Sequence, residues 1–200
     1  MTVSDVAPVA VALAQAFYDD PHFSWIVRND DIRMQRLERG FATFVGRVWL
    51  PVGGSYTHER QVGAALWMPP GTWHLGLLDQ LRVLPATIRA LRGDTTRMLR
   101  GLTFIEKKHP HEPEHWYLAT LGVATAWQGR GYGAALMRPV LERCDREQVP
   151  AYLEASTLRN RALYERHGFE VVEECTYAGD APPLWRMWRE PQRRPPIADR

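Results

Sequence analysis

The sequence has little cysteine and no long apolar run, and each absence excludes a class of protein. Its two cysteines, Cys144 and Cys175, stand in no CxxC or Cys/His spacing, so a disulfide framework is excluded and free thiols fit a reducing, cytoplasmic location. No apolar stretch reaches the ~18 residues of a membrane span, so we expect no membrane partner. No basic segment precedes an apolar one at the N-terminus, so we expect no signal peptide.

A surplus of one charge is also missing. The 200 residues include 25 basic and 23 acidic side chains, for a formal net charge of +2. No basic block stands out, so we expect no nucleic-acid partner. What is present is a globular composition, 45% hydrophobic and 24% charged, in a length that suits one domain. We predict a single domain over residues 1–190 and a disordered tail over 191–200, which has almost no apolar content.

Apolar periodicity predicts the order of the helices and strands. We expect helices over 4–18, 30–50, 131–147 and 159–167, two more between 74 and 107, a hairpin over 54–68, and strands over 116–124, 151–156, 169–176 and 184–189. Asp19-Asp20-Pro21 is expected to end the first helix. The pattern indicates an α/β fold without internal repeats.

A polar segment before the first of these later strands collects potential metal ligands. It contains His109, His111, Glu112, Glu114 and His115. Their spacing is neither helical nor that of a zinc site, and two prolines interrupt the segment. We therefore interpret residues 109–115 as a solvated loop and predict no metal.

The strongest chemical signal is a glycine-rich loop between an apolar strand and a helix. Residues 128–133, QGRGYG, follow the strand at 116–124, and the helix begins at once. Glycines allow a sharp turn, and the exposed amides at the start of a helix attract an anion such as a pyrophosphate. A plain strand-to-helix turn is the alternative. No Lys-Ser or Lys-Thr follows, which excludes a P-loop, and Ala134 and Leu136 stand where a dinucleotide motif needs its third glycine.

A second motif, N-x-x-x-Y-x-x-x-G-F, follows at residues 160–169. Together with QGRGYG it resembles the GNAT superfamily of acyl-CoA-dependent N-acyltransferases. The segments WYLATLGV, YLEAS and LYERHGF more closely resemble the branch that contains puromycin N-acetyltransferase. The resemblance is close over residues 115–175, looser over 56–73 and faint before 55. It implies a GNAT-like mixed, twisted sheet with helices on both faces, and acetyl-CoA between strands 116–124 and 151–156.

The resemblance also implies which residues bind the cosubstrate. The backbone of the strand residues Leu121, Gly122 and Val123 would bond the pantetheine arm, although Gly122 also fits a packing glycine. The loop amides would hold the pyrophosphate, with contributions from Gln128, Gly129, Arg130, Gly131, Tyr132, Gly133 and Ala134. Arg130 either pairs with a phosphate or extends into solvent. Asn160 either orients the amide arm or only caps its helix.

Two residues are candidate catalysts. The resemblance makes Tyr164 the acid, since a phenol of pKa ~10 can protonate a departing thiolate, and a core-facing ring is the alternative. Glu154 lies mid-strand in an apolar run, where a carboxylate is costly without a partner or a task. It would act as a base, bind the amine electrostatically, or form a structural ion pair with an arginine. We also expect a backbone amide near Val123 to stabilise the oxyanion.

These roles predict an N-acetyltransferase that moves an acetyl group from acetyl-CoA to a primary amine by direct attack. The two helices between 74 and 107 stand where an acceptor lid would lie, which favours a small-molecule amine as the partner. A protein or peptide N-acetyltransferase and a non-catalytic acyl-CoA-binding sensor are the alternatives.

The start of the chain leaves little room for the strand with which members of this superfamily usually open. The helix signal begins at Ser4, and residues 1–3 are too few for a strand. We therefore expect the first strand to be short or missing and the hairpin strand at 54–58 to have an unpaired edge. A monomer or a weak homodimer follows from this edge.

Overall fold

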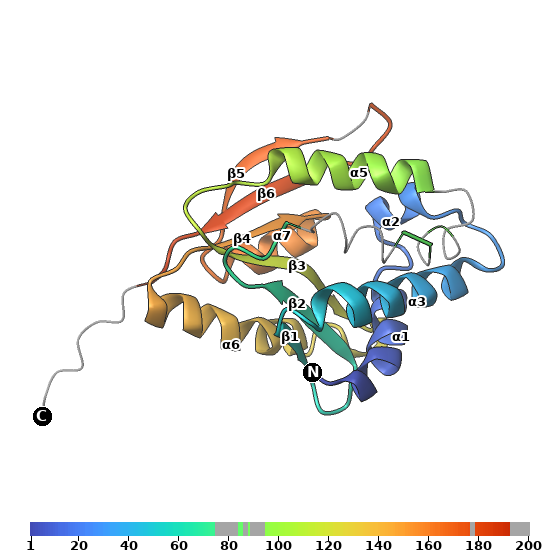
Figure 1. Cartoon of the computed structure of the whole chain (residues 1–200), viewed down its shortest axis with the longest axis horizontal. Helices are drawn as coiled ribbons and strands as arrows, with labels where there is room; N and C mark the ends of the chain where they lie inside the picture. The colour runs from blue at the N-terminus through green and yellow to red at the C-terminus, as the bar shows by residue number, and fades with distance from the viewer. Residues whose placement is uncertain (75–83, 86–87, 89–94, 177–178, 193–200) are drawn as a thin grey trace, which may run out of the picture.

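A six-stranded mixed sheet forms the centre of the computed structural model, which describes residues 1–74, 84, 85, 88, 95–176 and 179–192 (Figure 1). The strand order is β1-β2-β3-β4-β6-β5, and only β3 and β4 run parallel to each other. The strands are β1 (Gly54–Thr57), β2 (Gly63–Met68), β3 (Trp116–Val123), β4 (Ala151–Ala155), β5 (Glu170–Cys175) and β6 (Leu184–Arg189). The predicted hairpin and the four later strands are confirmed.

Helices cover both faces of this sheet, as predicted for a GNAT-like fold. They are η1 (Val3–Asp5), α1 (Val6–Ala16), α2 (Pro21–Ile26), α3 (Arg33–Phe44), the π-helical η2 (Val45–Trp49), α5 (Thr95–Lys108), η3 (Thr125–Trp127), α6 (Tyr132–Glu147) and α7 (Leu158–Glu165). None of the helices among the described residues is both long and apolar enough to cross a membrane.

Two hydrophobic cores lie on opposite faces of the sheet because side chains alternate along each strand. On β2, Ala65 and Trp67 pack in the core under α6, whereas Ala64 and Leu66 pack in the core under α1 and α3. Helix α5 lies alongside β5 and β6 (Figure 1), and Lys108 at its end bonds Glu173 of β5 at 2.7 Å. The β2 strand is therefore buried on both faces.

Some predicted boundaries require correction. Helix α2 was missed, because the sequence Asp20-Pro21 was interpreted only as the end of α1, although an Asp cap followed by proline equally starts a helix. Of the two helices expected between 74 and 107, the second is confirmed as α5 and the first lies largely outside the described residues. The tail over 193–200 lies outside them as well. At the start of the predicted tail, the Gln192 amide donates to Asp145 of α6 at 2.8 Å, so this residue is bound to the domain.

The N-terminal expectation is confirmed. Residues 3–5 form a short 3-10 helix that leads into α1, and β1 pairs only with β2 and stands at the edge of the sheet. The amino group of Met1 donates to the carbonyl of Ser55 at 3.2 Å. The sheet thus begins with the hairpin, and its first edge has no further strand among the described residues.

The parallel pair at the centre of the sheet is short. β3 and β4 pair only from Trp116 to Leu118 with Ala151 to Leu153, although β3 continues to Val123. The register with β2 also shifts here, since Leu66 faces Thr120 and Trp67 faces Leu118. This β-bulge bends β3 away from β4. Beyond Leu118 the two strands no longer pair, and the candidate site is at this point.

A buried arginine holds the segment between α1 and α3. The Arg33 side chain is 1% exposed and donates to the Tyr18 carbonyl from Nε at 3.1 Å and from Nη2 at 2.7 Å. It also donates to the carbonyls of Phe23, within α2, and Val27, which directly follows α2. One guanidinium therefore joins α2 to the segment that follows α1.

Candidate active site

The glycine-rich loop has the backbone that an anion site requires. Gly131 caps α6 with a φ of 82°, and Gly129 has a φ of 75°. A Cβ at either position would meet no atom within 4 Å, so glycine is needed for its positive φ rather than for space. No side chain of the described residues caps α6, so the amides of its first turn lack a side-chain acceptor. These donors fit a pyrophosphate.

The side chains of two polar residues in this loop, Gln128 and Arg130, contact other residues of the chain. Gln128 donates from Nε2 to the Val123 carbonyl at 3.0 Å and accepts from Arg159 at 2.9 Å, so it fastens the loop to the end of β3. Arg130 is exposed, with its guanidinium 5.2 Å from the centre of the Trp127 ring. Arg159 was missed from the sequence, because only the fold brings it beside the loop.

The strand residues expected to bond the pantetheine arm lie where β3 has left β4. Leu121, Gly122 and Val123 pair with β2 on their other side. A Cβ on Gly122 would lie 2.7 Å from the Leu13 side chain and 2.8 Å from Phe17, so the glycine is explained by the close packing of α1. The packing interpretation of Gly122 therefore holds, while its backbone bond to the cosubstrate stays a prediction.

Helix α7 carries the second motif and confirms that its two residues share one face. Thr157, not Asn160, caps this helix, since the Thr157 hydroxyl accepts from the Asn160 amide at 3.1 Å. The Asn160 side chain instead donates from Nδ2 to the Ser156 hydroxyl at 3.3 Å. The alternative that Asn160 is only a cap is thereby wrong.

Tyr164 lies in the core and still has an unoccupied hydroxyl. The residue is 5% exposed, and its ring packs edge-on against Phe169 at 6.0 Å. Within the described part of the chain its hydroxyl makes no hydrogen bond. Burial, and then the negative charge of Asp20, raise the pKa of the Tyr164 phenol well above its ordinary value of 10.0. The hydroxyl is therefore protonated and free to donate.

Glu154 has one oxygen bonded and one unbonded. Tyr117 donates its hydroxyl to Oε2 at 2.8 Å, while Oε1 is buried without a hydrogen-bond partner among the described residues. Burial raises the pKa of the carboxyl to about 7, against the lowering effect of the hydrogen bond from Tyr117 and of the nearby Tyr152 hydroxyl and Arg186 charge. The cross-strand neighbour Arg186 bonds Tyr152 at 3.0 Å and also Glu173, so no direct ion pair with Glu154 is seen. This oxygen is therefore open to a donor such as a water or an ammonium group.

The solvated loop predicted over 109–115 is wrong for two of its histidines. His109 and His115 are 3% and 2% exposed, and their Nε2 atoms lie 2.9 Å apart. Trp73 stacks on His109 at 4.0 Å, and His115 donates from Nδ1 to the Pro113 carbonyl at 2.8 Å. Burial lowers the pKa of both, that of His109 to about 3. No group of three or more metal-ligating residues occurs within the described ranges.

A polar cluster at the end of β4 was not found from the sequence. Asp20 caps α2 with Oδ1, which accepts from the amides of His22 at 2.9 Å and Phe23 at 3.2 Å. Its Oδ2 accepts from the Ser156 hydroxyl at 2.6 Å. The Asp-Pro signature could have indicated the cap, but Ser156 is far away in the sequence.

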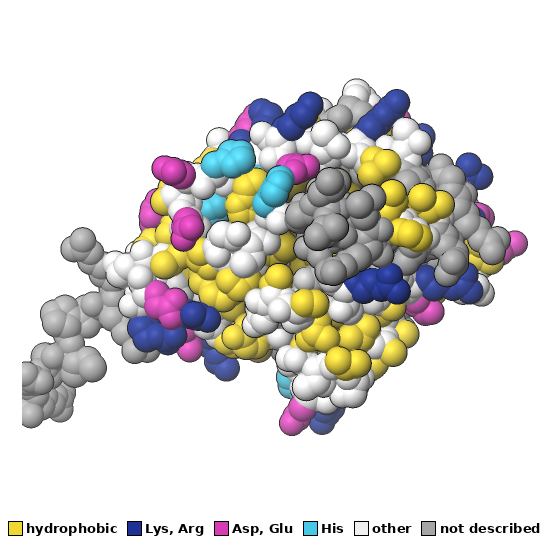
Figure 2. All heavy atoms as spheres, in the orientation of Figure 1, with side chains coloured by type: hydrophobic (Ala, Val, Ile, Leu, Met, Phe, Trp, Pro, Cys, Tyr) yellow, Lys and Arg dark blue, Asp and Glu magenta, His cyan; other side chains and the backbone are white. Residues whose placement is uncertain are grey.

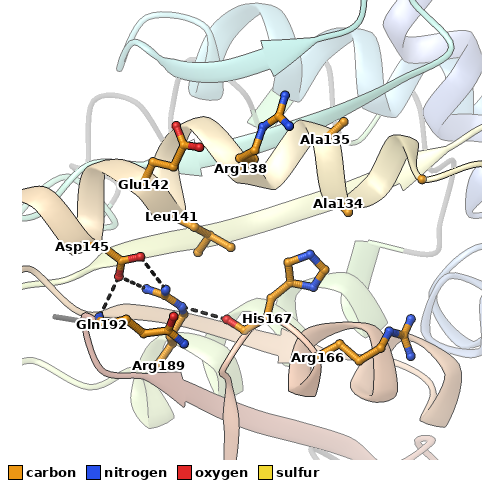
Figure 3. Close-up of a pocket in the computed structure, with 11 residues that line it drawn as sticks. Ala134, Ala135, Arg138, Leu141, Glu142, Asp145, Arg166, His167, Arg189 and Gln192 are labelled. Carbon is orange, nitrogen blue, oxygen red and sulfur yellow. Dashed lines mark hydrogen bonds and ion pairs between the residues drawn. The ribbon is translucent and has the colours of Figure 1, made fainter. Parts of the chain in front are cut away.

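A groove of about 450 Å³ leads away from the loop between α6 and the end of α7 (Figure 3). Gly131 and Ala134 lie at its start, and the His167 ring points into it toward α6. An ion pair closes its far end, where Arg189 donates to Asp145 at 2.7 Å and 2.9 Å. On the face shown in Figure 2, basic and acidic side chains are interspersed rather than gathered by sign.

Known proteins share this architecture. Residues 88–169 match the model of the acetyltransferase (GNAT) family. An uncharacterized N-acetyltransferase of Schizosaccharomyces pombe is 28% identical over 201 residues, which cover 94% of this chain and 81% of that protein. These matches do not specifically support the puromycin N-acetyltransferase branch, which stays a prediction.

Solved structures agree in fold. A Corynebacterium glutamicum protein described as histone acetyltransferase HPA2 and related acetyltransferase superposes with a TM-score of 0.72 at 24% identity, covering 98% of this chain and 96% of that one. The polyamine N-acetyltransferase of Drosophila melanogaster superposes with a TM-score of 0.61 at 14% identity, covering 95% and 97%. Residues 88–169 thus match the GNAT family of acetyltransferases, which use acetyl-CoA as the acetyl donor, and the chain as a whole has the fold of solved acetyltransferases.

Proposed function

We propose that this protein transfers an acetyl group from acetyl-CoA to a primary amine of a small molecule. The observation that carries the proposal is the orphaned Oε1 of Glu154, buried beside the point where β3 and β4 part. A buried carboxylate with an empty acceptor position is suited to an ammonium group. When bound, acetyl-CoA supplies a thioester whose acyl carbon forms the new bond to nitrogen as the bond to sulfur breaks.

The chain offers a surface for each part of the cosubstrate. The amides of Tyr132, Gly133 and Ala134 would bind the pyrophosphate at the start of α6. Asn160 directs its Nδ2 toward Ser156, which leaves Oδ1 free to accept from an amide of the pantetheine arm. The groove beside Gly131 would receive the nucleotide end.

Two residues would handle the protons of the reaction. Glu154 would take a proton from the incoming ammonium, and its pKa of about 7 suits a base that works near neutral pH. Tyr164 would give a proton to the departing thiolate, since the raised pKa of its phenol keeps the hydroxyl protonated. The ammonium loses two protons as the amide forms: one goes to Glu154, which later releases it to solvent, and the second makes up for the proton that Tyr164 gives to sulfur, so one proton is released overall.

The acceptor side of the site favours a small amine over a peptide. Arg97 of α5 donates to the Trp25 carbonyl of α2 at 3.1 Å and lies 5.4 Å from the Trp25 ring. This contact joins α5 to α2 and would restrict an open groove. Solved relatives named for small amines, such as the arylalkylamine N-acetyltransferase 2 of Aedes aegypti (TM-score 0.57, 14% identity), superpose over 95% of this chain. The Corynebacterium glutamicum description keeps a protein acceptor as the second candidate.

An acceptor screen tests this proposal. Purified protein, acetyl-CoA and a panel of polyamines, arylalkylamines and lysine-containing peptides would be assayed for release of the CoA thiol. We expect turnover with one or more small amines and its loss in Glu154→Gln. Turnover only with peptides would support the second candidate. CoA binding without turnover on any acceptor would indicate a sensor and contradict the proposal.

A further inference from the structure

One carboxylate joins the N-terminal helices to the end of β4. Asp20 is 8% exposed, and its two oxygens are divided between two tasks. Oδ1 accepts from the first amides of α2, and Oδ2 accepts from the Ser156 hydroxyl at 2.6 Å. Ser156 follows Glu154 by two positions and precedes α7, which carries Tyr164. Asp20 therefore bonds a residue that lies between the two candidate catalysts in the sequence.

The direction of the hydrogen bonds in this cluster is fixed by chemistry. An ionised carboxylate can only accept, so the single hydroxyl proton of Ser156 points at Asp20. The Ser156 oxygen can then only accept from its other neighbour, Asn160. The carboxamide of Asn160 must therefore present Nδ2 to Ser156, at 3.3 Å, and its Oδ1 elsewhere.

We propose that Asp20 is a positioning residue which acts through Ser156 to hold Asn160 with its Oδ1 free, as the acceptor for an amide N–H of the pantetheine arm. The inference rests on the proposed function, because it requires acetyl-CoA beside α7. In this chain the orientation of Asn160 is thus set by a residue from the opposite end of the sequence, 136 positions before Ser156.

The charge of Asp20 has a second consequence, which concerns the candidate acid Tyr164. It contributes to the raised pKa of Tyr164, so it also keeps the candidate acid protonated. Removal of the charge alone should therefore affect cosubstrate binding and proton donation without removing a side chain from the core.

The sharpest variant is Asp20→Asn, which keeps the shape and reverses one hydrogen bond. The amide oxygen can still cap α2, but the amide nitrogen now donates to the Ser156 oxygen. The Ser156 proton is then free to donate to Asn160 Oδ1, which turns the Asn160 nitrogen outward. By calorimetry we expect CoA affinity to fall about tenfold, equivalent to ~1.4 kcal/mol. Affinity for adenosine 3′,5′-diphosphate, which lacks the pantetheine arm, should stay unchanged.

Ser156→Ala and the double variant provide the control. Ser156→Ala should weaken CoA binding in the same way, and adding Asp20→Asn should cause no further loss, because both act along one path. Additive losses, or equal losses for CoA and adenosine 3′,5′-diphosphate, would overturn the inference. Unchanged CoA affinity in both folded single variants would also overturn it. A wild-type protein that binds no CoA would instead remove the proposed function itself.

Discussion

The two carboxylate oxygens of Glu154 lie in different surroundings, and the difference has consequences for activity. Oε2 is held by Tyr117, which fixes the carboxyl in place, while Oε1 is buried and unbonded. We expect Glu154→Gln to lower kcat by ~10²–10⁴-fold, the usual effect of removing a placed base. In the wild type, log(kcat/KM) should show an ionisation near pH 7 that the variant lacks. Full activity in the variant would leave Glu154 with a structural role.

The same carboxyl should make the fold less stable at alkaline pH. Its pKa is about 7 in the folded protein against a value of 4.5 for an unperturbed glutamate. The folded state therefore holds the proton more tightly, and the free energy of unfolding falls as pH rises through this window. Relative to wild type, Glu154→Gln should gain stability between about pH 5 and about pH 8, by on the order of 3 kcal/mol at most. Urea denaturation at both pH values measures this gain, and a constant difference would contradict it.

Tyr164 combines a buried ring with a hydroxyl that the described protein does not use. Tyr164→Phe removes only that hydroxyl, so the core packing against Phe169 should survive. We expect CoA affinity close to wild type and a kcat lower by ~10²–10⁴-fold. Thermal melting controls for folding. Near-normal turnover, with the chemical step shown to limit the rate, would leave Tyr164 as a packing residue only.

At the scale of elements, the turn from β3 into α6 depends on backbone shape and on charge separately. Gly131→Asp brings strain, because φ is 82°, and a negative charge beside the helix amides. Gly131→Ala brings the strain alone and is the matched control. We expect Gly131→Asp to lower CoA affinity more than tenfold beyond the effect of Gly131→Ala, as measured by calorimetry. Equal affinities for the two variants would argue against an anion at this loop.

Helix α2 depends on a single buried guanidinium. Arg33→Lys keeps the positive charge but cannot reach the carbonyls of Tyr18, Phe23 and Val27 together. Buried acceptors left unpaired cost ~1–3 kcal/mol each, so we expect a loss of at least ~2 kcal/mol in unfolding free energy. An exposed arginine, Arg39→Lys, is the control and should change little. Denaturant unfolding of the two variants provides the comparison.

The elements that sequence patterns could predict are those specified by neighbours along the chain. The alternation in 116–124 and 151–156, and the glycines at 128–133, determine β3, β4 and the loop locally. Contacts between distant residues carry no such local signal. His109 and His115 are polar by type, but the rings of Trp73 and Trp188, which are distant in sequence, pack against them. The bond from Ser156 to Asp20 likewise joins residues 136 positions apart. The motif residues could therefore be predicted from the sequence, whereas the distant residues that hold the site in place could not.

At the scale of the whole molecule, the edge of the sheet at β1 has no further strand among the described residues. β1 pairs only with β2, and Met1 caps its far side at a single carbonyl. We expect sedimentation velocity to show a monomer at low concentration and a weak dimer at high concentration. Ser55→Pro removes a backbone donor from this edge strand and should not dimerise more strongly than wild type. A tight dimer whose affinity is unchanged by Ser55→Pro would mean that subunits meet elsewhere.

Because β3 and β4 pair over so few residues, the sheet consists of two halves, called leaves here, that are joined along a short spine. Strands β1, β2 and β3 form one leaf and β4, β6 and β5 the other, and only three residue pairs form the spine. Amide hydrogen exchange should show each leaf opening as its own cooperative unit, with the spine residues Trp116 to Leu118 among the slowest. A ligand that bonds both leaves would then stabilise each of them against opening. CoA should slow exchange in β4 and β6 as well as at the loop, far beyond the atoms it touches.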